Sequence, residues 1–365
     1  MNQQVTPIKY SVIVGSGSYI PTRKIKNEDF MNRTFYDAEG KKLTKSNEEV
    51  IRKFSDITGI FERRYVTDDL VASDIAYFAA KEALDSANID GETLDYIIVA
   101  HNFGDIKADN RRSEFVPALA SRVKQRLGIK NSNAVGYDLP FGCAGWLQAM
   151  IQADFYIRSG AATRILVIGA ETLSRIADPH DRDGMIYADG AGAVIVEARE
   201  SKTPVGILSH CAHTYATEHA YVLRMGASNN PDYPENHLFL KMQGRLLYEH
   251  ALKEVPQVVK ESIERAGASI GDIDKILIHQ ANTKMVDSIL KRLLEEYGIK
   301  KLPENIMPLT ISWLGNSSVA TLPTLYDLLI KGKLENYVLK KGSTIVLVSV
   351  GAGVNINSMV YKIPE

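Results

Sequence analysis

The stretch "KEALDSANIDGETLDYIIVAHNF", Lys81–Phe103, aligns without a gap on "KESIERAGASIGDIDKILIHQAN", Lys260–Asn282. In both copies an amphipathic helix is followed by a polar turn and then by a short apolar strand that ends in polar residues. Further along, "SGAATRILVIGAE" (159–171) resembles "KKGSTIVLVSVGAG" (340–353), and each is a glycine-containing turn that leads into a β-branched strand. Two correspondences in the same order predict two related α/β halves, which meet near residues 200–205.

The length of 365 residues fits this division, because a domain usually holds ~100–200 residues. We therefore expect an N-terminal half of residues 1–202 and a C-terminal half of residues 203–365. The repeat is half the chain long, which is far longer than the units of a solenoid.

The composition is that of a soluble globular protein, with 45% apolar residues, 24% charged residues and a net charge of −1. Without a broad basic field, we expect no nucleic-acid partner. The apolar runs are far shorter than the ~20 residues that span a bilayer, and the first residues lack the features of a signal peptide. We therefore expect a cytoplasmic protein without a membrane span.

Metal binding is not expected either. Zinc-ligand spacing is absent from the two cysteines, Cys143 and Cys211, and from the His-rich stretch at 209–219.

Polar segments follow the predicted strands at the positions where an open α/β sheet binds ligands, beyond the carboxyl ends of its strands. These segments are "HNFGD" at 101–105, "HQANTK" at 279–284 and "GAG" at 351–353. We expect the functional site to be built there.

The stretch "LPFGCAGWLQAM" (139–150) places Cys143 between small residues, where an almost wholly apolar helix is expected to begin. Such a helix is typical of a buried position. A thiol at a helix N-terminus meets unpaired N–H groups and a partial positive charge, which lower its pKa from ~8.5 toward neutrality. The alternative is a structural role, because free cysteines are often buried as small hydrophobic residues.

Two further side chains can complete a site around Cys143. His279 ends the predicted strand "KILI", and Asn316 lies in the turn "WLGNSS" before another apolar helix. With a thiol, an imidazole and a carboxamide in one place, the thiolate could attack a thioester while the other two groups stabilise a developing enolate or oxyanion.

Taken together, these segments resemble the β-ketoacyl-acyl-carrier-protein synthase III family of the thiolase superfamily, over essentially the full length. The motifs that carry the resemblance are "GSGSYIP" (15–21), "TGIFERR" (58–64), "FGCAG" (141–145), "DPHDRDG…ADGAGAVIVE" (178–197), "HQAN" (279–282) and "GNSS" (315–318). The resemblance implies a five-layered αβαβα fold and a homodimer. It also implies an acyltransferase whose substrates are phosphopantetheine thioesters of coenzyme A or acyl carrier protein, with no further cofactor.

The resemblance assigns roles to the three candidate catalytic residues. Cys143 would accept an acyl group from a thioester. His279 and Asn316 would assist the decarboxylation of malonyl-ACP, or a related thioester, and stabilise the enolate that gives the β-ketoacyl product. The N–H groups of Cys143 and Gly353 would form an oxyanion hole.

Binding roles are implied in the same way. Arg182 and Asn282 would contact coenzyme A or its pantetheine arm. Lys284, Lys291 and Arg292 would dock an acidic carrier protein, although the spacing of 284 and 291 on one helix face equally fits an ordinary solvated surface.

Departures from the family pattern concern the substrate. Lys53 and Ile57 stand where relatives that use coenzyme A primers have a tryptophan and an arginine. Val116, at the end of an enlarged loop, replaces a bulky aromatic that limits the primer pocket, which favours longer acyl chains. A specialised ketosynthase of an alkylresorcinol-like or polyketide-like pathway that uses longer acyl-ACP substrates therefore stays open, as do a cysteine thioesterase and a non-catalytic subunit.

Overall fold

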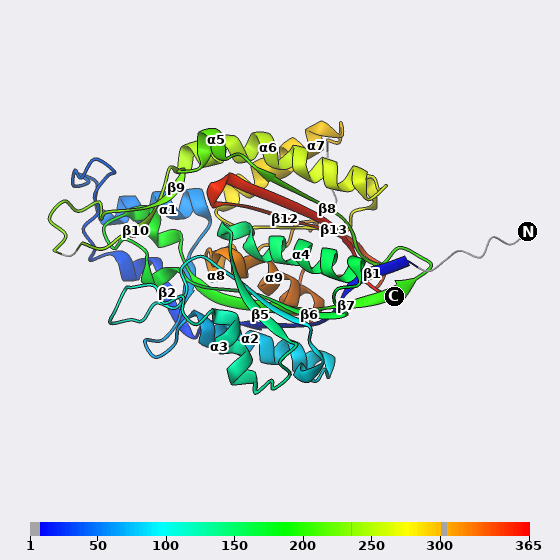
Figure 1. Ribbon diagram of the computed structural model, residues 1–365. Coiled ribbons are helices and arrows are strands. Elements are labelled where there is room, and N and C mark those ends of the chain that lie inside the picture. The colour runs from blue at the N-terminus through cyan, green and yellow to red at the C-terminus, as the bar shows by residue number, and fades with distance from the viewer. Residues whose placement is uncertain (1–7, 235, 301–304) are drawn as a thin grey trace, which may run out of the picture.

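The computed structural model describes residues 8–234, 236–300 and 305–365 (Figure 1). Two sheets are stacked between three helical layers, so the predicted five-layered αβαβα fold is confirmed. Helices α2 (Ala72–Ala87) and α3 (Leu119–Leu127) form one outer layer, α4 (Gly145–Ser159) and α9 (Thr321–Ile330) the middle layer, and α6 (Gly244–Arg265) and α7 (Thr283–Glu296) the other outer layer.

The five-stranded sheet has the order β1-β7-β6-β4-β5, and the four-stranded sheet has the order β11-β12-β13-β8. The strands of the first sheet are β1 (Ile8–Tyr19), β4 (Tyr96–His101), β5 (Val135–Pro140), β6 (Arg164–Thr172) and β7 (Asp189–Ser201). Those of the second are β8 (Gly206–Thr214), β11 (Lys275–Ile278), β12 (Thr344–Gly351) and β13 (Asn355–Lys362).

The two sheets repeat one pattern of strand pairing. β4 runs parallel to β6, with Ile97 opposite Leu166, and β11 runs parallel to β12, with Ile276 opposite Val346. Antiparallel partners follow in both sheets, β7 then β1 in the first and β13 then β8 in the second. The sequence segments that match contain β4 and β11 and, further along the chain, β6 and β12. The sequence similarity and the topology therefore agree. A boundary at residue 202 lies in the link between β7 and β8; the division into 1–202 and 203–365 itself stays a prediction.

Helix α4 is apolar on nearly every side because it lies between the two sheets. Trp146, Met150 and Ile157 are each 2% exposed or less, and they belong to a core that includes Val167 of the first sheet and Leu347 of the second. The regular α-helix begins at Gly145. Cys143 lies before it, in a single 3₁₀ turn at Gly142–Ala144.

Smaller elements surround the carboxyl ends of the strands. They are α1 (Asn47–Thr58), α5 (Ala216–His219), α8 (Ile311–Leu314), the strand pair β2 (Arg23–Lys26) and β3 (Glu62–Tyr65), and the strand pair β9 (Leu223–Gly226) and β10 (Phe239–Met242). No helix within the described ranges is both long and apolar enough to cross a membrane.

Candidate active site

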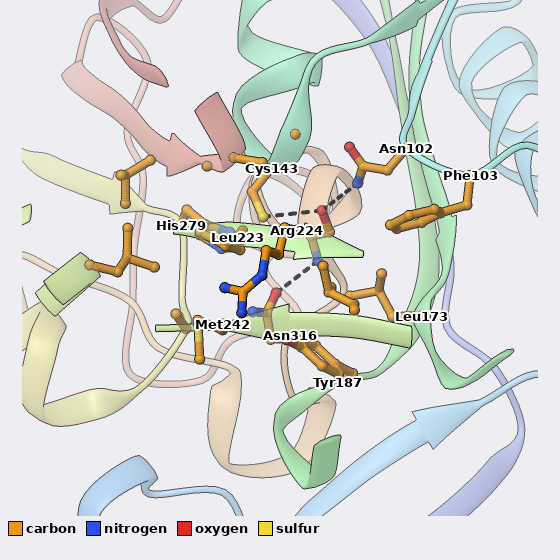
Figure 2. A pocket seen from close by; sticks show the side chains of 18 of the residues that line it. Asn102, Phe103, Cys143, Leu173, Tyr187, Leu223, Arg224, Met242, His279 and Asn316 are labelled. Carbon is orange, nitrogen blue, oxygen red and sulfur yellow. Dashed lines mark hydrogen bonds between the residues drawn. The ribbon is translucent and has the colours of Figure 1, made fainter. Parts of the chain in front are cut away.

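A cavity of about 290 Å³ lies at the carboxyl ends of the central strands, and Cys143, His279 and Asn316 all line it (Figure 2). The three side chains come from segments after β5, after β11 and after α8. Most of the remaining wall is apolar and includes Phe103, Leu173, Leu223, Leu240, Met242, Leu247 and Met285. The structure therefore brings the predicted thiol, imidazole and carboxamide to one largely apolar chamber.

Glycines allow the two halves to close around Cys143. A Cβ on Gly351, at the end of β12, would lie only 2.5 Å from the backbone nitrogen of Cys143. Gly142 has a φ of 64°, and a Cβ there would lie 2.7 Å from the nitrogen of Ala352. The hydroxyl of Ser349 donates to the Cys143 carbonyl at 3.0 Å. The end of β12, together with Ala352 directly after it, thus fixes the turn that holds Cys143.

The expectation of a lowered thiol pKa is wrong. Burial is the main reason that the pKa of Cys143 is raised to about 11; the negative charge of Glu171 acts in the same direction, and a hydrogen bond from the Ser318 hydroxyl acts against both. The apolar chamber excludes the water that would otherwise solvate a thiolate, so the charged form is disfavoured. The resting site therefore holds a neutral thiol.

His279 continues the strand ladder of β11, since its N–H donates to the Val348 carbonyl at 2.8 Å. Its side chain is 2% exposed, and burial lowers the pKa of the imidazole to about 4. Its Nδ1 has no hydrogen-bond partner among the described residues. At neutral pH the ring is uncharged, with one nitrogen carrying a proton and the other able to accept one.

Asn316 is held by its backbone and by its side-chain oxygen. Its N–H donates to the Ile186 carbonyl at 3.0 Å, and its Oδ1 accepts the Ser318 N–H at 2.8 Å. Gly315, with a φ of 69°, permits this turn, because a Cβ there would lie 2.7 Å from Cβ of the buried Arg63. With Oδ1 engaged, the amide nitrogen is the part of Asn316 that can serve a ligand.

Gln280, the second residue of "HQAN", links His279 to the segment before Asn316. Its side chain is fully buried, donates to the Pro308 carbonyl at 3.0 Å, and accepts from the N–H groups of Thr310 and Ile311 at 2.9 and 3.0 Å. The motif therefore supplies both a site residue and the clamp that positions its neighbour.

A second cavity of about 510 Å³ adjoins the first, and the two share Met242, Leu247, Ala281, Met285 and Asn316 in their walls. Arg182, Asn282 and Lys284 line this outer cavity, and so do Lys53 and Ile57. The Asn282 side-chain oxygen also caps α7 by accepting the Met285 N–H at 2.7 Å.

The other predicted residues lie outside both cavities. Lys291 and Arg292 are exposed on α7, the helix that also carries Lys284. Gly353 follows the lining residue Ala352 but is not itself part of the wall. Val116 is 90% exposed and lines neither cavity of its own chain.

Among the wall residues that were not predicted from the sequence, two form a hydrogen-bonded path to Cys143. Ser318 donates a hydrogen bond to Sγ of Cys143 at 3.2 Å, and Asn102, from the first half, contacts Ser318 (Figure 2). Both stand in segments that were expected at the site, "GNSS" and "HNFGD", but the sequence alone does not indicate that these two side chains contact each other beside Cys143. Within the described ranges, no group of three or more His, Cys, Asp or Glu side chains is placed to hold a metal ion.

Comparison with known proteins agrees with this geometry. Residues 137–216 match the 3-oxoacyl-[acyl-carrier-protein (ACP)] synthase III family, and residues 263–363 match the C-terminal region of the same family. The 3-oxoacyl-[acyl-carrier-protein] synthase III from Aquifex aeolicus VF5 is 28% identical with a TM-score of 0.77, over 96% of this chain and 99% of that one. FabH from Pseudomonas aeruginosa PAO1 is 26% identical with a TM-score of 0.79, over 98% and 99%. OleA from Xanthomonas campestris, at 18% identity and a TM-score of 0.73 over 97% and 98%, shares the fold. With both family matches and full-length structural likeness, the chain belongs to the 3-oxoacyl-acyl-carrier-protein synthase III family of condensing enzymes.

Proposed function

We propose that this enzyme transfers an acyl group from a thioester to Cys143 and then joins it to a malonyl thioester on acyl carrier protein, with loss of CO₂. The observation that carries this proposal is that Cys143, His279 and Asn316 line one cavity that adjoins an outer basic cavity. An apolar chamber can hold an acyl chain, and the outer cavity can hold the arm that delivers it.

In the first step the sulfur of Cys143 attacks the thioester carbonyl, the bond to the departing sulfur breaks, and the S–H proton leaves with the departing thiol. The N–H groups of Cys143 and Gly353 are the proposed donors to the tetrahedral oxyanion. One such donor is worth about 3 kcal/mol in the transition state. Because the resting thiol is neutral, this proton must be lost as the sulfur attacks.

In the second step the malonyl thioester loses CO₂, and its enolate attacks the acyl group on Cys143. The β-ketoacyl thioester departs, and the released sulfur regains a proton from solvent. The enolate oxygen needs hydrogen-bond donors that are present before charge develops. A neutral His279 ring and the amide nitrogen of Asn316 can supply them, since both are fixed by backbone contacts.

The outer cavity suits a phosphate-bearing arm. Its lining residues include five cationic side chains, Lys45, Lys53, Arg182, Arg245 and Lys284, and one carboxylate, Asp183. Lys291 and Arg292 extend the basic surface along α7. We assign acyl carrier protein as the partner that uses Lys284, Lys291 and Arg292, with Arg182 and Asn282 contacting the arm.

We further propose that the enzyme works as a homodimer in the cytoplasm. Both cysteines are free, and a nucleophilic thiol needs a reducing compartment. Val116, exposed in its own chain, can limit a primer only in a partner's cavity, so its pocket role depends on the dimer.

A specialised ketosynthase that prefers longer acyl-ACP donors is the second candidate. Lys53 and Ile57 line the outer cavity where coenzyme A users of the family have a tryptophan and an arginine. A lysine cannot stack on an adenine ring as an indole does, and an isoleucine offers no hydrogen bond to a phosphate.

Intact-mass measurement of the acyl-enzyme tests both candidates. The protein is incubated with acetyl-CoA or with acyl-ACP donors of increasing chain length, then with malonyl-ACP, and Cys143→Ala serves as the control. We expect a mass increase on Cys143 followed by a β-ketoacyl product. Absence of any acyl adduct on wild-type protein contradicts the proposal, and free acid without a new carbon–carbon bond indicates a thioesterase.

A further inference from the structure

A chain of hydrogen bonds runs from a buried carboxylate to the sulfur of Cys143. Oε2 of Glu171, on β6, accepts from the backbone N–H of Asn102 at 2.9 Å and from its Nδ2 at 2.6 Å. The same Nδ2 donates to Oγ of Ser318 at 3.0 Å, and that hydroxyl donates to Sγ of Cys143 at 3.2 Å. Figure 2 shows the last two contacts beside the cavity.

The direction of every bond in this chain follows from its first member. Oε2 of Glu171 is the acceptor for two N–H groups, so the amide of Asn102 must present its nitrogen, which carries two hydrogens. One hydrogen faces Glu171 and the other faces Ser318, whose oxygen therefore accepts. The single hydroxyl hydrogen of Ser318 then remains for the sulfur.

We propose that Ser318 is a positioning residue that holds the sulfur of Cys143 through a donated hydrogen bond, and that Glu171 and Asn102 impose its direction. The inference rests on the proposed function, in which the sulfur gains negative charge when it attacks and again when it is released. A donor already aimed at Sγ stabilises that charge without reorganisation.

Ser318 also joins two of the three proposed catalytic groups, Cys143 and Asn316. Its φ of 53° is rare for a residue other than glycine, and this conformation lets its N–H bind Asn316 Oδ1 at 2.8 Å while its hydroxyl reaches Cys143. Replacing Ser318 by alanine removes the hydroxyl and leaves the N–H, so the two functions can be separated.

Glu171 has a second effect, because its charge opposes ionisation of the thiol. It is fully buried, its Oε1 has no partner among the described residues, and burial raises the pKa of its carboxyl to about 7. Among the titratable groups around the chain, His101 on β4 favours the ionised carboxylate, while Tyr187 and His279 face the sulfur's cavity as neutral groups. Arg224 on β9 lines the same cavity as a cation, and all the variants below retain it.

Two substitutions should therefore shift the pH midpoint of Cys143 alkylation in opposite directions. Ser318→Ala removes the donor and should raise the pH midpoint of Cys143 alkylation by iodoacetamide and slow acylation about tenfold. Glu171→Gln keeps an acceptor for Asn102 but removes the charge, and should lower the midpoint. Ser317→Ala, the neighbouring serine whose hydroxyl contacts Thr321, is the matched control and should change neither quantity.

Asn102→Ala covers the case in which Ser318→Ala does not fold, and should behave like Ser318→Ala because the hydroxyl loses its anchor. An unchanged alkylation profile in Ser318→Ala, or in Asn102→Ala, overturns the inference while wild-type acylation still supports the proposed function. Movement of the midpoint in the same direction for Ser318→Ala and Glu171→Gln also overturns it. Failure of wild-type protein to acylate is a separate result that overturns the proposed function.

Discussion

Gly351→Ala should disable the nucleophile by steric pressure alone. The φ of Gly351 is −153°, which alanine adopts freely, so the substitution adds only a methyl group. That Cβ would lie 2.5 Å from the nitrogen of Cys143, 3.1 Å from its Cα and 3.0 Å from the nitrogen of Ala144. Since ordinary contacts begin at 3.4 Å, the turn or the strand must move by about 0.9 Å.

A displacement near 1 Å at the reacting atom costs about a hundredfold in rate, and overpacking a core costs about 1–3 kcal/mol in unfolding free energy. We therefore expect Gly351→Ala to acylate about a hundredfold more slowly in a single-turnover intact-mass assay and to unfold at lower urea concentration. Gly271→Ala is the control, because its nearest new neighbour, Ser269 Oγ, lies 3.6 Å away. Acylation by Gly351→Ala within threefold of wild type would refute the close packing of the two halves around Cys143.

Three further results are expected. His279→Ala and Asn316→Ala should still form the acyl-enzyme, but each should condense it with malonyl-ACP about 10²–10³-fold more slowly, because an enolate donor is lost; slower acylation without a condensation defect contradicts these roles. Alkylation of Cys143 by iodoacetamide should rise about tenfold per pH unit from pH 7 towards the thiol pKa of about 11, and a plateau below pH 9 contradicts the neutral resting thiol. Lys291→Glu with Arg292→Glu should raise KM for acyl-ACP at low salt, leave KM for acyl-CoA unchanged, and lose its effect at high salt.

The fold could be predicted because the duplication is visible in the strands themselves. "YIIVA" and "KILIH" are each preceded by a helix and followed by a polar segment. The strands that pair with them, at 164–172 and 344–351, also resemble each other in sequence. Buried parallel strands are short apolar runs of β-branched residues, and little else can stand at those positions. The pattern therefore survives after most of the surrounding sequence has diverged.

The ionisation state of Cys143 could not be predicted, because it depends on a balance between two environments. Its place before an apolar helix indicates a partial positive charge, which favours a thiolate. Its neighbours in space are an apolar wall and the carboxylate of Glu171, which favour a thiol, and Glu171 stands 28 residues away in a strand that the sequence marks only as apolar. Desolvation is a property of the assembled cavity and leaves no local pattern.

Each half supplies part of the proposed site, and this explains which residues must be held in a fixed position relative to one another. The first half supplies Cys143, and the second supplies His279 and Asn316, so the site exists only if the two sheets keep their relative position. Contacts between the two halves therefore belong to the proposed site: Gly351 closes on the turn of Cys143, and Ser318 bonds to its sulfur. Small residues and hydroxyls suit this task better than large apolar ones, because they fix two backbones at short range without filling the chamber that the acyl chain needs.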